Sequence, residues 1–174
     1  LALRKGVEAL STFSIDLGVS IPVGKDSLSM RTKWEEGNDQ YVVKSPLSGV
    51  ITAMAPVNDV REAVTTLLRK DTDSKLALIK LNDKNRLGGS IFSEVHRQDI
   101  QETPDVDSSE MFIKMFDLTQ SLIQDGTIFA LHDVSDGGLV SALSELAFTA
   151  RSGISIQLDS LVTDKSLLNE VLFN

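Results

Sequence analysis

The sequence has 174 residues, no cysteine and a formal net charge of −8, from 17 basic and 25 acidic side chains. This length allows one domain or two small ones, and it is enough to bury a core. The acidic balance excludes a broad nucleic-acid-binding face, and no apolar run approaches the ~20 residues that cross a bilayer. The lack of cysteine excludes thiolate sites and fits a reducing compartment, so we expect a cytoplasmic protein that binds neither nucleic acid nor membranes.

The first 70 residues alternate between helical and extended patterns. Apolar residues at helical spacing predict a helix over residues 1–17, which Gly18 caps at its C-terminus. Gly37-Asn38-Asp39 is typical of a loop or a hairpin turn. Asn58 or Asp59 is expected to cap a further helix, whose apolar face would carry Val60, Val64, Leu67 and Leu68. Three segments are predicted to be extended: 21–23, 41–43 and 50–55.

The charged stretch 70–75 contains no apolar residue, so we expect a domain boundary there, with domains at 1–72 and 73–174. Beyond it, serine caps and apolar spacing predict helices from Ser108 or Ser109, after residue 138, and over 165–173. Strands are predicted at 76–81, 127–131 and 154–158. This mixture indicates an α/β or α+β protein. The chain starts at Leu1 and stops within a helical pattern, which predicts a piece of a longer protein.

One segment carries the strongest chemical pattern. A predicted strand ends at His132, and two carboxylates and a hydroxyl (Asp133, Ser135 and Asp136) follow before Gly137-Gly138 opens a helix. Carboxylate oxygens suit Mg²⁺, and free N–H groups at a helix start suit phosphate. The alternative interpretation is that Ser135 or Asp136 only caps the helix.

Two further segments are weaker. Gly24-Lys25-Asp26-Ser27 follows an extended segment and could line a polar pocket. Its spacing is not that of a P-loop, and from the residues alone an ordinary turn at the end of a strand is the favoured interpretation. Gly88-Gly89-Ser90 could form a backbone nest for an anion or a flexible turn. His96 and His132 have no third histidine and no cysteine to complete a zinc site.

Together, these segments resemble the family of the large, single-chain phosphoribosylformylglycinamidine synthase (FGAM synthetase) in order and rough spacing. The resemblance covers essentially the whole chain and rests on residues 21–30, 87–90 and 132–139. It implies the end of an aminoimidazole ribonucleotide synthetase-like, barrel-forming N-terminal domain, followed by most of the matching α+β C-terminal domain.

The resemblance implies an ATP-dependent, glutamine-hydrolysing ligase of purine biosynthesis. Its substrates would be ATP, formylglycinamide ribonucleotide and glutamine-derived ammonia, its cofactors Mg²⁺ and ATP or ADP, and its partners the remaining domains of the parent chain. Asp133 is implied to be a Mg²⁺ ligand, and the implied nucleotide-binding residues are Ser135, Gly24, Lys25, Asp26, Ser27, Gly137 and Gly138. The family's matching pocket usually holds a tightly bound ADP in an auxiliary role, so the implied site is either catalytic or auxiliary.

Two other interpretations stay open at this stage. The chain could be a non-catalytic nucleotide-binding or dimerisation module of the same superfamily, and unpaired strand edges would favour its self-association. It could also be another superfamily member, such as a selenophosphate or thiamine-phosphate kinase, although residues 24–27 argue against this.

Overall fold

The computed structural model describes residues 2–28, 30–70, 73–162 and 164–174. Parts of three predictions lie outside the described residues. They are Leu1 of the predicted helix 1–17, residue 72 at the predicted domain boundary, and Ser29 of the 21–30 segment. The chain divides into two compact units, Leu1–Val57 and Asn58–Asn174, which are described one at a time. The predicted boundary between domains 1–72 and 73–174 stays a prediction.

Unit 1 begins with the predicted helix, α1 (Ala2–Leu17). Gly18 ends it with a positive φ of 67°. The N–H of Gly18 donates to the carbonyl of Ile15 at 3.0 Å, and that of Val19 to Ser14 at 2.9 Å, which is the hydrogen-bond pattern of a Schellman cap. The sequence prediction of this helix and its cap is confirmed.

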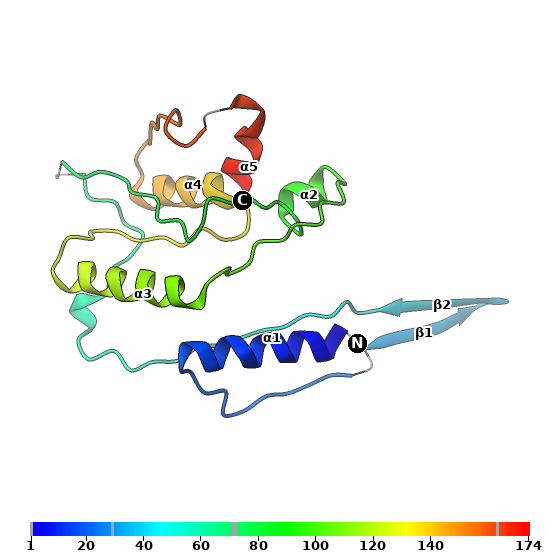
Figure 1. Cartoon of the computed structure of the whole chain (residues 1–174). Coiled ribbons are helices and arrows are strands. Elements are labelled where there is room, and N and C mark those ends of the chain that lie inside the picture. Colours follow the sequence, from blue (N-terminus) through cyan, green and yellow to red (C-terminus); the bar gives the residue numbers. More distant parts are fainter. Residues whose placement is uncertain (1, 29, 71–72, 163) are drawn as a thin grey trace. The chain divides into compact units, whose positions relative to one another are not determined.

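A two-stranded antiparallel hairpin follows, with β1 (Arg31–Glu36) and β2 (Asp39–Lys44) (Figure 1). Gly37 adopts a φ of 64° in the tight turn, so the hairpin turn expected here is confirmed. Trp34 lies opposite Tyr41, and their rings stack with centroids 5.2 Å apart. A cross-strand aromatic pair of this kind stabilises the register of the hairpin.

The other apolar runs predicted as strands do not form regular strands. Segments 21–23, 50–55, 76–81, 127–131 and 154–158 are all described, and none is assigned to a strand. An apolar strand is stable only when neighbouring strands satisfy its backbone N–H and C=O groups, and within the described residues only β1 and β2 pair. The prediction of strands in these five segments is therefore wrong for this structure.

Unit 2 opens with a single 3₁₀ turn, η1 (Val60–Glu62), which Asp59 caps by accepting from the Arg61 N–H at 2.9 Å. The longer helix predicted after Asp59 does not form. This segment instead makes hydrogen bonds to distant parts of unit 2. The carbonyl of Thr65 accepts from the Leu131 N–H at 3.0 Å, and Lys70 Nζ donates to the Arg151 carbonyl at 3.0 Å. These tertiary bonds outweigh the weak helical preference of the β-branched residues there.

The remaining helices of unit 2 agree with the serine and glycine signals. Ser90 caps α2 (Ile91–Val95), and Ser108 caps α3 (Ser109–Gln124) by accepting from the Met111 N–H at 3.2 Å. Next come α4 (Gly138–Ala150), the 3₁₀ turn η2 (Lys165–Leu167) and α5 (Leu168–Phe173). Of these helices, only the short α2 was not expected from the sequence.

The buried apolar residues of the described chain gather in unit 2. Four lie at helical spacing on α4 and the fifth is Leu87: the set is Leu87, Leu139, Ala142, Leu146 and Ala150. The α4 stripe packs in part against α5, and Figure 1 shows the two helices next to each other. Helices with one small sheet make the architecture α+β, which confirms the mixed class. Within the described residues, no helix has the length and apolarity that crossing a membrane requires.

Candidate functional site

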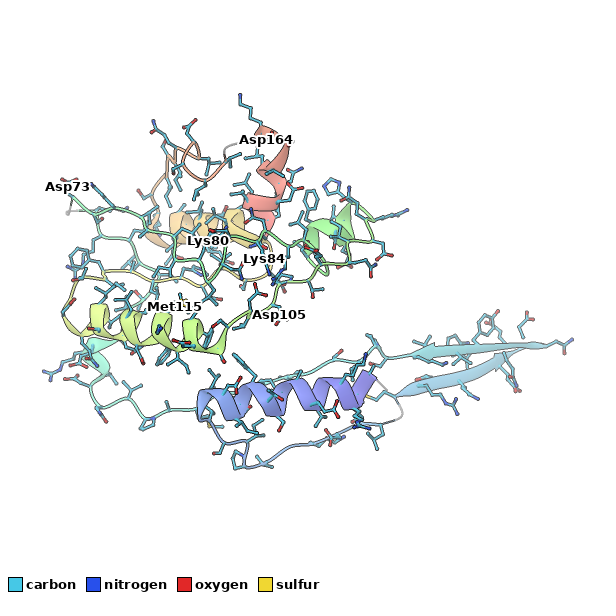
Figure 2. All side chains as sticks on the ribbon, viewed as in Figure 1. Asp73, Lys80, Lys84, Asp105, Met115 and Asp164 are labelled. Atoms are coloured by element: carbon cyan, nitrogen blue, oxygen red, sulfur yellow. The ribbon has the colours of Figure 1, made fainter. Side chains whose placement is uncertain are left out.

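A cleft of about 1040 Å³ in unit 2 brings together two of the segments that the sequence singled out. Gly88-Gly89-Ser90 and residues 131–137 both line it, with residues 77–82 and side chains of α3. Figure 2 labels four of the cleft-lining residues: Met115 on α3, and Lys80, Lys84 and Asp105 on the segments outside the helices. Segments about 45 positions apart in sequence therefore share one wall.

His132 is the anchored residue of the 131–137 segment. Its side chain is 14% exposed, and Nε2 lies 2.6 Å from Oε2 of Glu145 on α4. Nδ1 lies 2.7 Å from the Asp133 carbonyl oxygen and 3.5 Å from Asp133 Oδ1. Both ring nitrogens therefore lie within hydrogen-bonding distance of an oxygen atom of this chain.

Asp133 carries a largely exposed carboxylate and belongs to the cleft wall. Its side chain is 82% exposed, and Asp133, Ser135 and Asp136 all line the cleft wall. Within the described residues no side chain caps α4, whose N-cap is Gly137 with a φ of 87°. The interpretation of Ser135 or Asp136 as a mere helix cap therefore does not fit the structure. Ser135 contributes its carbonyl oxygen, which accepts from the Gly138 N–H at 2.9 Å.

The two glycines of this segment differ in what surrounds them. Gly137 lines the cleft, whereas Gly138 is buried and does not. A Cβ on Gly138 would lie 2.6 Å from the backbone carbon of Phe173, so α5 approaches α4 this closely only because residue 138 has no side chain. The predicted contact of Gly138 with a nucleotide stays a prediction, but its packing role is plain in the structure.

Hydrogen bonds to neighbouring carbonyl groups hold the Gly88-Gly89-Ser90 turn in place. The Gly88 N–H donates to the Glu102 carbonyl at 2.7 Å, and a Cβ there would meet that carbonyl oxygen at 2.5 Å. Ser90 Oγ donates to the Leu87 carbonyl at 2.6 Å while it caps α2. Hydrogen bonds of this kind order the turn, so the interpretation as a flexible turn does not fit.

Sequence reasoning missed an ion-pair cluster beside the cleft. The Arg86 guanidinium, 10% exposed, contacts both carboxylate oxygens of Asp107, at 2.6 and 2.8 Å, and Lys84 Nζ lies 3.1 Å from the same group. Hydrogen bonds from Arg86 and then from Lys84 lower the pKa of Asp107 from its ordinary value. The Arg86 N–H also donates to Asn174 Oδ1 at 2.5 Å. The partners are far apart in sequence, so no local pattern could have predicted the cluster.

Lys80 is the other basic group of the cleft wall that the sequence analysis passed over. Its Nζ donates to Asn85 Oδ1 at 2.8 Å, which is a neutral partner. The charge of Lys80 is therefore not neutralised by that contact, in contrast to Lys84. The available signal was a single lysine inside the apolar run 76–81.

The third predicted segment, Gly24-Lys25-Asp26-Ser27, belongs to unit 1. All four residues are exposed, and Lys25 Nζ donates to Ser27 Oγ at 2.5 Å. This contact ties the ammonium group to the turn. The assignment of these residues to a nucleotide site stays a prediction.

The donor set of the cleft suits a divalent cation only as part of a larger shell. The described residues contain no cluster of three or more histidine or carboxylate side chains that could enclose a metal. Mg²⁺ in nucleotide sites takes one or two carboxylates and completes its shell with water and phosphate oxygens. The exposed Asp133 carboxylate fits that limited demand.

Two family models match the chain. The model described as FGAR-AT PurM_N-like domain matches residues 1–56, and that described as AIR synthase related protein, C-terminal domain, matches residues 73–173. These superfamily domains occur in ATP-using enzymes, FGAM synthetase among them. The second match covers more than half of the chain and contains every residue that lines the cleft except Asn174. The chain therefore belongs to the AIR synthase related family.

Proposed function

We propose that this chain is a segment of the synthetase core of FGAM synthetase. That enzyme is a ligase that uses ATP and glutamine-derived ammonia to convert formylglycinamide ribonucleotide to the amidine. The order of the two matched domains supports this assignment, since a PurM_N-like domain named for this amidotransferase precedes the C-terminal domain. Residues 21–30, which lie within the first matched range, resemble the same family.

The part we assign to unit 2 is one wall of a Mg²⁺–nucleotide site, catalytic or auxiliary. The single observation that carries this is the convergence of the 88–90 and 131–137 segments on one cleft. Asp133 would supply a carboxylate oxygen to Mg²⁺, and Ser135 would contact the nucleotide. A bound Mg²⁺ would neutralise phosphate charge, while the protein holds the phosphates in place.

The glycines and basic groups complete the proposal. Gly137 lines the cleft at the start of α4 with a positive φ, and a Cβ there would overlap Ser141 Oγ, so this close turn requires glycine. We assign it to the phosphate side of the site, because the start of a helix suits an anion. We assign Gly138 to the same nucleotide-binding turn as Gly137. In unit 1, a phosphate group is the proposed ligand of Gly24, Lys25, Asp26 and Ser27. The ammonia source and the other synthetase unit would come from the remaining domains, and a cytoplasmic location accords with this pathway.

The test is the thermal stabilisation of the intact synthetase by ADP and Mg²⁺, measured for wild type and Asp133→Asn. Removal of the carboxylate charge should reduce the melting-temperature shift at fixed ligand, because stabilisation follows ligand affinity. Asp117→Asn is the matched control, since Asp117 is exposed on α3 and does not line the cleft. An unchanged shift in Asp133→Asn removes Asp133 from the ligand set.

A second measurement concerns catalysis. The 174-residue chain, given ATP, Mg²⁺, formylglycinamide ribonucleotide and free ammonia, should form no amidine, because the proposal leaves half of each site to other domains. The intact synthetase should form it under the same conditions. Robust turnover by the isolated chain would contradict the proposal.

A second candidate function, a non-catalytic nucleotide-binding or dimerisation module, is favoured by one observation. In unit 1 apolar side chains stand largely open to solvent, with Val23 81%, Val50 91% and Met54 90% exposed. Exposed apolar side chains in such numbers favour association. Ammonia-dependent amidine formation by the intact protein would exclude this alternative, whereas concentration-dependent dimers without turnover would support it.

A further inference from the structure

His132, which lines the cleft, and Glu145 on α4 form a two-point clamp. We propose that they act as positioning residues for Asp133: Glu145 fixes the imidazole of His132, and His132 in turn fixes the peptide and carboxylate of Asp133 for divalent-cation binding. This inference rests on the function proposed above. It concerns two residues to which neither the family resemblance nor the matched domains assign a role.

The contacts form a continuous path from a helix to the cleft. Glu145 lies on α4, and its carboxylate holds Nε2 of His132 at 2.6 Å. Nδ1 on the opposite side of the ring holds the Asp133 carbonyl at 2.7 Å and is 3.5 Å from the carboxylate. The orientation of Asp133 is thereby tied to a rigid element rather than to the loop alone.

The need for such a clamp follows from the exposure of the loop. Of residues 131–136, all of which are described, His132 alone is not exposed. An exposed carboxylate on an exposed loop loses conformational freedom when it binds a cation, and this entropy opposes binding. A group that orders the loop beforehand removes part of that cost.

Oxygen atoms of this chain engage both ring nitrogens of His132, although the residue lines the cleft. Glu145 on α4 holds Nε2, and the Asp133 peptide holds Nδ1. The side chain therefore acts through Asp133. Outer partners of metal ligands commonly change metal affinity by about 10–100-fold when removed.

The experiment measures Mn²⁺ binding to the intact synthetase by electron paramagnetic resonance at saturating ADP. The relevant sites are those that Asp133→Asn removes or weakens, which separates them from other metal sites of the enzyme. Glu145→Ala and His132→Ala should each weaken this class about tenfold. Glu145→Gln should keep affinity within about threefold, because its amide oxygen still accepts from Nε2.

A double-substitution cycle tests whether the effect passes through Asp133. In the Asp133→Asn background, Glu145→Ala should cause no further loss of Mn²⁺ affinity, because the positioned carboxylate is already absent. Alanine favours helix, so this change should not unfold α4, and the melting temperature without ligand checks this. Glu110→Ala is the matched control, since Glu110 is an exposed glutamate on α3 outside the cleft lining.

Each result decides a different statement. Loss in both alanine variants, rescue by Glu145→Gln and no further loss in the double variant support the clamp. An Asp133-dependent class that Glu145→Ala and His132→Ala leave unchanged overturns the clamp and leaves the proposed function standing. The clamp is also overturned if Glu145→Ala lowers the Mn²⁺ affinity equally in the wild-type and Asp133→Asn backgrounds. The lack of any Asp133-dependent class overturns both proposals together. If Glu145→Ala fails to fold, His132→Ala decides in its place.

Discussion

Gly138→Ala tests how much the stability of unit 2 depends on the absence of a Cβ at the start of α4. Gly138 begins α4 with a φ of 67° and is buried beneath the end of α5. A Cβ there would lie 2.6 Å from the Cα and carbonyl carbon of Phe173 and 2.7 Å from the Leu172 carbonyl oxygen. These neighbours are backbone atoms, which cannot rotate away as the end of a flexible side chain can.

The expected loss of unfolding free energy has two parts. An alanine in the left-handed region costs about 1–2 kcal/mol. Forcing an extra carbon into a packed contact costs about 1–3 kcal/mol. The sum is about 2–5 kcal/mol, a large share of the roughly 5–15 kcal/mol that stabilises a typical domain.

Two other glycines of unit 2 separate these two parts. Gly126 has a φ of 76° but no atom within 4 Å of the added carbon, so Gly126→Ala should cost only the left-handed part, about 1–2 kcal/mol. Gly153 has neither a positive φ nor a neighbour within 4 Å. Gly153→Ala should be neutral or should stabilise by about 0.4–1 kcal/mol through the unfolded state.

The assay must report on unit 2. The chain's one tryptophan and one tyrosine, Trp34 and Tyr41, both lie in unit 1, so their fluorescence does not follow α4. Hydrogen exchange of α4 amides at increasing urea gives the opening free energy of that helix directly. Equal losses for Gly138→Ala and Gly126→Ala would show that the contact with α5 carries no weight and would refute the reasoning.

Two further predictions concern charge. Hydrogen bonds from Arg86 and then Lys84 lower the pKa of Asp107, so its contribution to stability is present above the unfolded pKa of about 3.9 and is lost as the pH falls through the lower folded pKa. Urea denaturation from neutral to acid pH should therefore show Asp107→Asn less stable than wild type near neutrality and equal to it in strong acid; a pH-independent difference would contradict this. Lys80→Met should weaken ADP binding to the intact synthetase more than Lys84→Met, because Asp107 already neutralises part of the Lys84 charge, and calorimetry at low and high salt compares them. Equal losses would count against this account of the cleft.

Local signals in the sequence predicted the helices well and the strands poorly. Ser108, Gly18 and the 37–39 turn act within a few residues, and each marks the element that the structure contains. An apolar run such as 76–81 carries no such local information, because a strand exists only through its neighbours. The helix predicted after Asp59 does not form for a related reason, because the carbonyl of Thr65 accepts a hydrogen bond from the distant Leu131 N–H.

The candidate site divides in the same way. The 131–138 segment could be singled out because its carboxylates and glycines are adjacent in sequence. The partners that shape it could not, since Glu145 reaches His132 from the next helix and Asp107 meets Arg86 across 21 positions. Both contacts are consequences of how the chain packs, and neither leaves a recognisable spacing. The anchored histidine is thus the residue for which the structure changes the interpretation most.

The net charge of −8 says little about the cleft itself. Asp107 holds Arg86 and Lys84, whereas Lys80 donates to the neutral amide of Asn85. The Asn85 contact leaves the positive charge of Lys80 on the cleft wall. Asp133 places an exposed carboxylate elsewhere on the same wall. A surface with both signs held apart suits a ligand that itself carries both, as a complex of a divalent cation with a polyphosphate does. An acidic chain therefore does not need a basic face to bind such a ligand, because the cation engages the carboxylate and the phosphates engage the lysine.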